Sequence, residues 1–338
     1  MTGTTIPVPT PPAAPTTARR SPRRNVWVRY GARRLLHFVV SVVVLVTVAF
    51  LMVQLIPGDP AQTSAGSNAP PELVEQRRVA LGLDQPLWVQ YLHLWRGLFT
   101  GDLGDSITLR VPVSEVMGAR LPATLELAGI SVAIVLLLAI PVGLAAGALT
   151  RRGRRRGLEV AYTSSSTVLA VVPEFLFGVG LVYVFAVTLD VLPVAGRDGP
   201  SSYVLPVTAL VIGSTAALSR IVRAETLSVL EHDYVRTARA KRMSAARLYL
   251  KHVLPNLLTS TLTVSGLLLG GMIAGTVLVE NIFAWPGLGT TIMQSIQKKD
   301  YPLIQTIVVF YGATILLINL VIDVVLIFLD PRSALKDG

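Results

Sequence analysis

The sequence contains no cysteine, so disulfide bonds, thiolate metal ligands and cysteine nucleophiles are all excluded. Histidine is scarce as well, and its four copies (His37, His93, His232 and His252) do not stand at the spacing of metal ligands. A Walker A string, Gly-x4-Gly-Lys-Ser/Thr, is absent, so the chain lacks the loop that cradles ATP phosphates. We therefore expect no metal site, no bound cofactor and no enzymatic activity in this chain.

Charge is sparse and apolar residues are abundant. Charged residues make up 15% of the 338 residues and hydrophobic residues 52%, and the mean hydropathy is +0.60. A soluble domain of this size needs far less apolar surface. The net charge of +10 does not indicate nucleic-acid binding, because the basic residues flank long apolar runs instead of forming a patch with aromatics. The composition is typical of an integral membrane protein.

Six apolar stretches reach the roughly 20 residues that a helix needs to cross a bilayer. They predict an all-α polytopic membrane protein with six transmembrane helices, at Leu35–Ile56, Thr124–Leu149, Val168–Leu189, Tyr203–Val222, Thr261–Ile282 and Leu303–Leu329. Pro173 and Glu174 interrupt the third stretch near its start.

Positive charge predicts the orientation. Residues 1–34, 150–160, 220–260 and the tail after Leu329 hold about three quarters of the 30 lysines and arginines, which places them in the cytoplasm with both termini. We interpret 1–34 as a disordered basic tail and 333–338 as a second tail. Arg23-Arg24 could belong to a twin-arginine export signal, but the first apolar run is too long and no cleavage site follows it. That run is interpreted as an anchor in the plasma (inner) membrane.

The cytoplasmic loop at 223–260 is unusually long and has the pattern of two short helices. Asp233 is expected to cap the first and Ser244 the second, and Pro255 ends the pair. A basic amphipathic helix can lie on lipid head groups. The small residues Thr237, Ala238 and Ala240 instead suit a helix that enters a groove on another protein.

This loop, with Arg236-Thr237-Ala238 and Leu254-Pro255, resembles the EAA loop of ABC-transporter permeases. From about residue 30 onwards the chain resembles the dipeptide/oligopeptide/nickel import branch, first permease subunit type. The motifs that carry the resemblance are Pro57-Gly58-Asp59-Pro60-Ala61, Leu81-Gly82-Leu83-Asp84-Gln85-Pro86, Gly101-Asp102-Leu103-Gly104-Asp105-Ser106, Arg120-Leu121-Pro122-Ala123-Thr124-Leu125-Glu126, Trp285-Pro286-Gly287-Leu288-Gly289, Asp300-Tyr301-Pro302 and Leu329-Asp330-Pro331-Arg332.

The resemblance implies a type I ABC importer permease-like bundle with a five-helix core at 124–332. It also implies four partners besides the bilayer: a second homologous permease, two ATPase subunits that bind the ATP, and an extracytoplasmic solute-binding protein. The coupling residues would be Tyr234, Arg236, Thr237, Ala238, Arg239, Ala240, Lys241, Arg242, Met243 and Ser244 within the 233–255 loop. Arg242 replaces the glycine of the motif and His252 its isoleucine, and we expect the corner to shift to Met243-Ser244. Di- or oligopeptides are the favoured cargo; nickel chelates, glutathione and haem remain open.

The loop at 57–123 would be extracytoplasmic. Its Trp88, Tyr91 and Trp95 fit either an interfacial aromatic belt or docking of the binding protein. Trp285 and Gly287 fit either a plain turn or a gate or docking element at the pore mouth.

Three ionisable residues fall inside predicted spans, where such residues are functional candidates. Glu174 and Glu280 lie near membrane boundaries, where we expect water to solvate them, while Asp323 lies deeper with Asn319 one turn before it. Each could line the translocation path or make polar contacts within the bundle.

A secondary transporter is the rival reading, although no internal repeat of the kind usual in that class is evident. An intramembrane enzyme is disfavoured, because no histidine lies within a span core.

Overall fold

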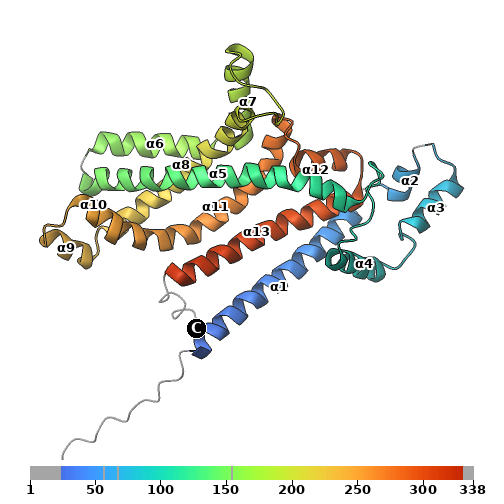
Figure 1. Ribbon diagram of the computed structural model, residues 1–338, viewed down its shortest axis with the longest axis horizontal. Helices are drawn as coiled ribbons and strands as arrows, with labels where there is room; N and C mark the ends of the chain where they lie inside the picture. The colour runs from blue at the N-terminus through green and yellow to red at the C-terminus, as the bar shows by residue number, and fades with distance from the viewer. Residues whose placement is uncertain (1–23, 56–57, 67, 154, 330–338) are drawn as a thin grey trace, which may run out of the picture.

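The computed structural model describes residues 24–55, 58–66, 68–153 and 155–329, and this part of the chain is helical with no β-strand. The all-helical prediction is thereby confirmed, and the tails at 1–23 and 330–338 lie outside the described residues. The helices labelled in Figure 1 are α1 (Arg24–Leu55), α2 (Pro60–Ala65), α3 (Pro71–Ala80), α4 (Leu87–Thr100), α5 (Val113–Thr150), α6 (Arg156–Val171), α7 (Glu174–Leu181), α8 (Ser201–Val229), α9 (Asp233–Ala240), α10 (Ala245–Leu248), α11 (Leu254–Ile282), α12 (Leu288–Gln297) and α13 (Tyr301–Leu329). Two π-helical segments, Val182–Thr188 and Tyr249–Val253, and a 3-10 turn at Arg151–Gly153 adjoin them.

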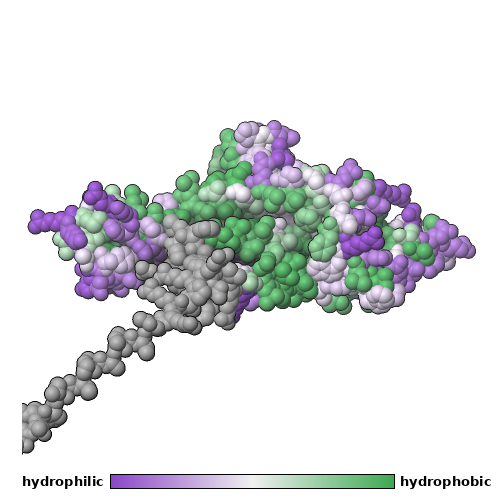
Figure 2. All heavy atoms as spheres, turned by 60° about the horizontal axis from the view of Figure 1, so that its bottom comes forward, coloured by the Kyte–Doolittle hydropathy of each residue, from purple (hydrophilic) through white to green (hydrophobic). Residues whose placement is uncertain are grey.

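The long helices run along one axis with short helices at its two ends, while the short helix α7 rises away from the bundle between them (Figure 1). α9 and α10 lie at one end, which we call the elbow end; α2, α3, α4 and α12 lie toward the other, which we call the loop end. Figure 2 shows apolar surface across the middle of the molecule and polar surface at both ends. This distribution suits a bundle that crosses a bilayer.

Four helices in the described residues are long and apolar enough to span a membrane, at Gly31–Leu55, Val113–Gly153, Ser201–Val229 and Tyr301–Val325. They overlap four of the six predicted spans. α6 and α7 together could make a fifth. Within α11, the apolar helix formed by the described residues is Gly270–Ile282, which is shorter than the other spans. The structure therefore supports four or five of the six expected spans.

Two boundaries differ from the sequence prediction. Residues 24–34 belong to α1, so this part of the expected disordered tail is helical. The predicted third span, Val168–Leu189, is broken between Val171 and Glu174 by a bend of 91°. Pro173 causes the break, because it has no N–H to donate and because it disfavours helical backbone in the preceding residue. Val172 is accordingly extended, with ψ of 121°.

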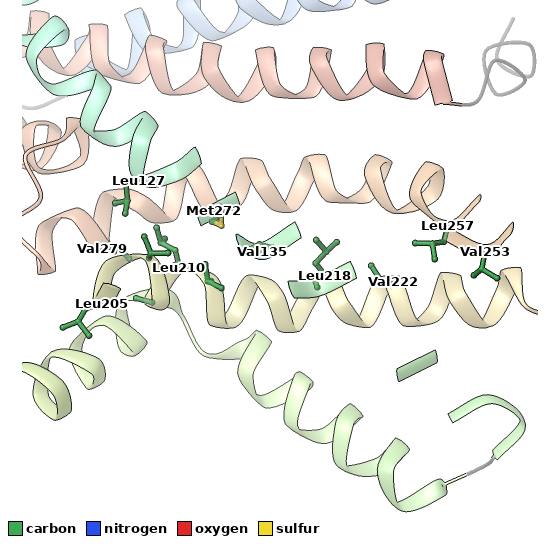
Figure 3. Packing of buried hydrophobic residues seen from close by; sticks show 14 of the residues in the cluster. Leu127, Val135, Leu205, Leu210, Leu218, Val222, Val253, Leu257, Met272 and Val279 are labelled. Atoms are coloured by element: carbon green, nitrogen blue, oxygen red, sulfur yellow. The ribbon is translucent and has the colours of Figure 1, made fainter. Parts of the chain in front are cut away.

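The packed centre of the bundle is α8. In its most apolar stretch 56% of the residues are buried, against 17% in that of α1 and 11% in that of α13. Side chains of α5, α8 and α11 interdigitate around it (Figure 3); they include Leu127, Val135, Leu210, Leu218, Val222, Met272 and Val279. α5 approaches α8 closely because Gly147 has no side chain: a Cβ there would lie 2.7 Å from Thr226. These three helices form the rigid frame on which both ends are mounted.

Candidate functional site

Residues 233–253 form a paired-helix elbow, made of α9, α10 and the π-helical turn that leads into α11. Its inward side chains, Val235 and Val253, are fully buried. They belong to the same apolar cluster as Val229 and Leu230, at the junction between α8 and the elbow. The segment that follows α5 also contacts this junction, because the Arg151 side chain donates a hydrogen bond to the Leu230 carbonyl at 2.8 Å. The elbow is thus packed against the end of α8 and continues directly into α11.

The outward side of the elbow is open. Most of the ten predicted coupling residues are exposed, and these are Tyr234, Arg236, Thr237, Arg239, Ala240, Lys241, Arg242 and Ser244. Ala238 is instead buried and Met243 half-buried. The predicted stripe of small residues is therefore divided, because Ala238 packs inward while Thr237 and Ala240 face outward. The outward surface of α9 therefore carries small residues among basic side chains.

The corner of the elbow lies at Arg242, and the expectation that it shifts to Met243-Ser244 is wrong. Arg242 has a φ of 54°, the left-handed backbone in which glycine is favoured. Its N–H donates to the Arg239 carbonyl at 2.9 Å, which closes the end of α9. The arginine therefore adopts the conformation that the motif glycine would take.

The helix starts within the elbow also differ in detail. His232, not Asp233, occupies the N-cap position of α9, with extended backbone. Ser244 occupies the N-cap position of α10 as predicted, but its side chain makes no capping hydrogen bond there.

At the loop end, one buried carboxylate joins three helices. Glu280 of α11 is fully buried; it accepts hydrogen bonds from the Thr124 hydroxyl of α5 at 2.7 Å and from the Gly289 N–H of α12 at 2.6 Å. The Thr124 oxygen in turn accepts from the Leu288 N–H at 2.8 Å. We call these four residues the hub. The expectation that water solvates Glu280 is wrong, since the Thr124 hydroxyl and an N–H at the start of α12 take the place of water.

The indole of Trp285 completes the attachment of α12. It is fully buried and donates from Nε1 to the Ala123 carbonyl at 3.0 Å. Gly287 is buried too, and a Cβ there would overlap Glu280 and Thr124. Trp285 and Gly287 are therefore not open to a docking partner in this conformation.

A second carboxylate, Asp300, fixes the loop that precedes α5. It accepts hydrogen bonds from the Ser106 hydroxyl and from the N–H groups of Ile107 and Thr108, both at 3.1 Å, and it is itself buried. The motif at 101–106 thus meets the motif at 300–302, just as the motif at 120–126 meets the motif at 285–289. Stretches far apart in the sequence become paired contacts at one end of the bundle.

Asp59 caps α2 and pairs with Arg78 of α3. Its carboxylate accepts from the Ala61 N–H at 2.9 Å and from Arg78 at 2.5 Å. This bond and charge raise the pKa of the Arg78 guanidinium above its usual value. The pair holds the two short helices together at the loop end.

One polar cluster at the loop end includes Arg197 and Tyr203, neither of which was predicted as a site residue. Arg197 pairs with Glu126 of α5 and donates to the Tyr203 hydroxyl, which itself donates to Glu126 at 2.8 Å. Arg197 also lies over the Trp285 ring, 5.9 Å from its centre. A lone arginine in a segment expected outside the cytoplasm, against the usual charge bias, was the available signal for this cluster.

The aromatic residues of α4 divide into two sets. Tyr91 bonds Thr47 of α1 at 2.8 Å and packs edge-on against Phe50, while Trp95 packs against Tyr91. Trp88 is exposed. Of the three α4 side chains proposed for docking, Trp88 is the one whose surface is mostly exposed.

The other intramembrane polar candidates lie apart from one another. Asp323 of α13 pairs with Arg34 of α1 at 2.6 Å, whereas Asn319 lies against Gly266 of α11. Glu174 is half-buried at the start of α7, beside Gly275 of α11. The structure thus places Asp323 and Glu280 in contacts between helices and does not gather the four residues into one site.

Comparison with known proteins places these features in a family context. The family model described as "Binding-protein-dependent transport system inner membrane component" matches residues 139–334, and the corresponding N-terminal model matches 27–128. The glutathione transport system permease protein GsiC of Salmonella typhimurium is 37% identical over 308 residues, covering 91% of this chain and 99% of that protein. Its counterpart from Escherichia coli K12 is 36% identical over 307 residues, with the same coverage. The elbow and the hub both lie within the matched residues.

Proposed function

Because this chain belongs to the family of binding-protein-dependent transport system inner membrane components, we propose that it forms half of the pore of an ATP-driven importer of short peptides. The family is that of permease subunits of ABC importers of the peptide/nickel type, in the inner membrane. The cargo, the coupling residues and the orientation are our proposal.

The cargo proposal rests on the relatives. Their names give glutathione as the transported compound. Glutathione is a tripeptide, so these names favour a short peptide over a nickel chelate or haem. Among short peptides, we propose glutathione or a compound of similar size and charge.

The elbow is the proposed contact with an ATPase subunit. The supporting observation is its two-sided construction: Val235 and Val253 anchor it to the bundle, while Thr237 and Ala240 leave a shallow surface open on the other side. Small side chains let a helix enter a groove on a partner. Nucleotide-driven closure of two ATPase subunits would then tilt the frame. A second permease and an extracytoplasmic binding protein complete the proposed assembly.

The orientation follows from the same assignment. An ATPase can reach the elbow only from the cytoplasm, so we propose that the elbow end faces the cytoplasm together with both termini. The loop end then faces the binding protein. Six spans remain our expectation for the whole chain.

A bulky substitution tests the coupling surface. Thr237→Trp should prevent co-purification of the ATPase subunits, because it fills the shallow surface of α9 without removing a buried contact. Ala80→Trp is the matched control, since Ala80 is exposed at the loop end, and it should leave assembly unchanged. Retention of the ATPases by Thr237→Trp would overturn the coupling assignment.

Uptake by vesicles tests the cargo. The complete transporter with its binding protein should accumulate labelled glutathione when ATP is inside, also after collapse of the proton gradient. An excess of unlabelled tripeptide should compete with it. Uptake that follows the proton gradient and not ATP would point to a secondary transporter, and uptake of nickel or haem alone would overturn the peptide assignment.

A further inference from the structure

A groove with both polar and apolar lining residues opens between α6 and α8 near the elbow end. Its volume is about 480 Å³, and its lining includes Tyr162 and Thr163 of α6 with Arg220 and Arg223 of α8. Two guanidinium groups and two hydroxyl-bearing side chains therefore face one space. Nothing in the coupling or the hub uses these groups.

The positive charge in this groove is only partly neutralised. Arg223 pairs with Glu159 at 2.6 Å and also donates to the Thr150 hydroxyl at 3.2 Å. Arg220 is exposed, and it makes no ion pair or hydrogen bond with the described residues. Its planar fork of N–H donors suits the oxygens of a phosphate or carboxylate. The groove is therefore ready to receive an anion.

The surroundings indicate which anion. Arg220 is the first charged residue of α8, after the charge-free stretch Ser201–Ser219, so it stands where the apolar part of this helix ends, toward the lipid head groups. On α6, one of the two helices that line the groove, Leu158 and Val160 are 42% and 57% exposed. A ligand here would meet cationic donors and an apolar flank together, as a phospholipid does. Basic pockets between helices at the cytoplasmic face are typical sites for anionic lipid head groups.

We propose that the α6–α8 groove binds the phosphate of an anionic phospholipid, with Arg220 as its principal contact. The head-group phosphate lies against Arg220, and the acyl chains follow the apolar surface of α6. This site would fasten α6 to α8 at the end of the bundle that carries the elbow. The proposal depends on the orientation only for the leaflet concerned, and it does not depend on the cargo.

The test uses the full chain in lipid nanodiscs and measures its thermal unfolding midpoint. Phosphatidylcholine discs are compared with discs that also contain phosphatidylglycerol and with phosphatidylcholine discs in inorganic phosphate. We expect phosphatidylglycerol to raise the midpoint, with a gain that shrinks as salt is added. Arg220→Gln should lose most of this gain, while Arg220→Lys should keep part of it. Arg152→Gln, at an exposed arginine of the same end outside the groove lining, should keep all of it.

Every outcome of these measurements either supports or overturns the lipid site. Native mass spectrometry should find phosphatidylglycerol retained by the unsubstituted chain and lost by Arg220→Gln. An equal gain in Arg220→Gln, or an equal loss in Arg152→Gln, would overturn the site, because general charge attraction would then explain the effect. Equal stabilisation by inorganic phosphate alone would overturn the lipid assignment in favour of a soluble anion. Because none of these readouts involves transport, their failure would be distinguishable from failure of the proposed function.

Discussion

At the corner of the elbow, Arg242 holds a left-handed backbone that costs most residues about 1–2 kcal/mol. Glycine adopts this conformation without that cost. We expect Arg242→Gly to keep ATPase coupling and to retain or raise the thermal unfolding midpoint. Arg242→Val should lower it, because a β-branched residue is least suited to positive φ. Stimulation of ATP hydrolysis by the loaded binding protein gives the coupling readout. A collapse of coupling in Arg242→Gly would show that the guanidinium, and not the backbone, is what the partner needs.

In the hub, the Glu280 carboxylate acts only as a hydrogen-bond acceptor. In Glu280→Gln one oxygen becomes an NH2 group, which would face either the Thr124 hydroxyl or the Gly289 N–H. A buried donor without an acceptor costs about 1–3 kcal/mol. We therefore expect a clear fall in the thermal unfolding midpoint and easier proteolysis around α12. Glu75→Gln, on the exposed surface of α3, should change little. An unchanged midpoint in Glu280→Gln would mean that the hub does not hold α12 in place.

At the scale of elements, the bend between α6 and α7 is set by one residue. Pro173→Ala restores an N–H and removes the constraint on Val172, so we expect the 91° angle to open. Spin labels on introduced cysteines at Ser164 and Val187 would report a longer distance, and the absence of native cysteine leaves these labels unique. Pro206→Ala, in the first turns of α8, is the control and should leave that distance unchanged. The same distance in Pro173→Ala would mean that packing against α8 and α11 fixes the bend.

The elements that the sequence predicted well are those whose signal is local. Charge-free apolar runs located α5, α8 and α13 because length and hydropathy alone define a span. The break at Pro173 has a local signal too, but the direction in which α7 continues does not, because no sequence pattern records the contacts that α7 makes with α8. Glu280 is a second case of this kind. Its hydrogen-bond donors come from Thr124 and Gly289, and no pattern in the sequence indicates that these residues are in contact. The motifs at 101–106 and 300–302 were visible in the sequence, but their contact through Asp300 required the fold.

For the whole molecule, α11 is the mechanical connection. It begins at the elbow and ends at the hub, so one helix carries both the proposed ATPase contact and the attachment of α12. Burial of Leu257 near one end and of Val279 near the other keeps it against α8. A tilt imposed at the elbow would therefore reach the loop end without a separate signal. This arrangement gives a physical route by which nucleotide hydrolysis on one side could alter the opening on the other.

That route requires the elbow end to face the cytoplasm, and the cysteine-free chain allows a direct test. We introduce one cysteine at Ala80, exposed at the loop end, or at Ser228, exposed beside the elbow. A membrane-impermeant maleimide should label Ala80→Cys once the outer envelope is opened and the inner membrane is still sealed. It should label Ser228→Cys only after the inner membrane is lysed, because the positive residues hold that end inside. The unsubstituted chain should take up no label in either case. Labelling of Ser228→Cys in sealed cells would place the elbow away from any cytoplasmic ATPase, and the coupling mechanism would fail with it.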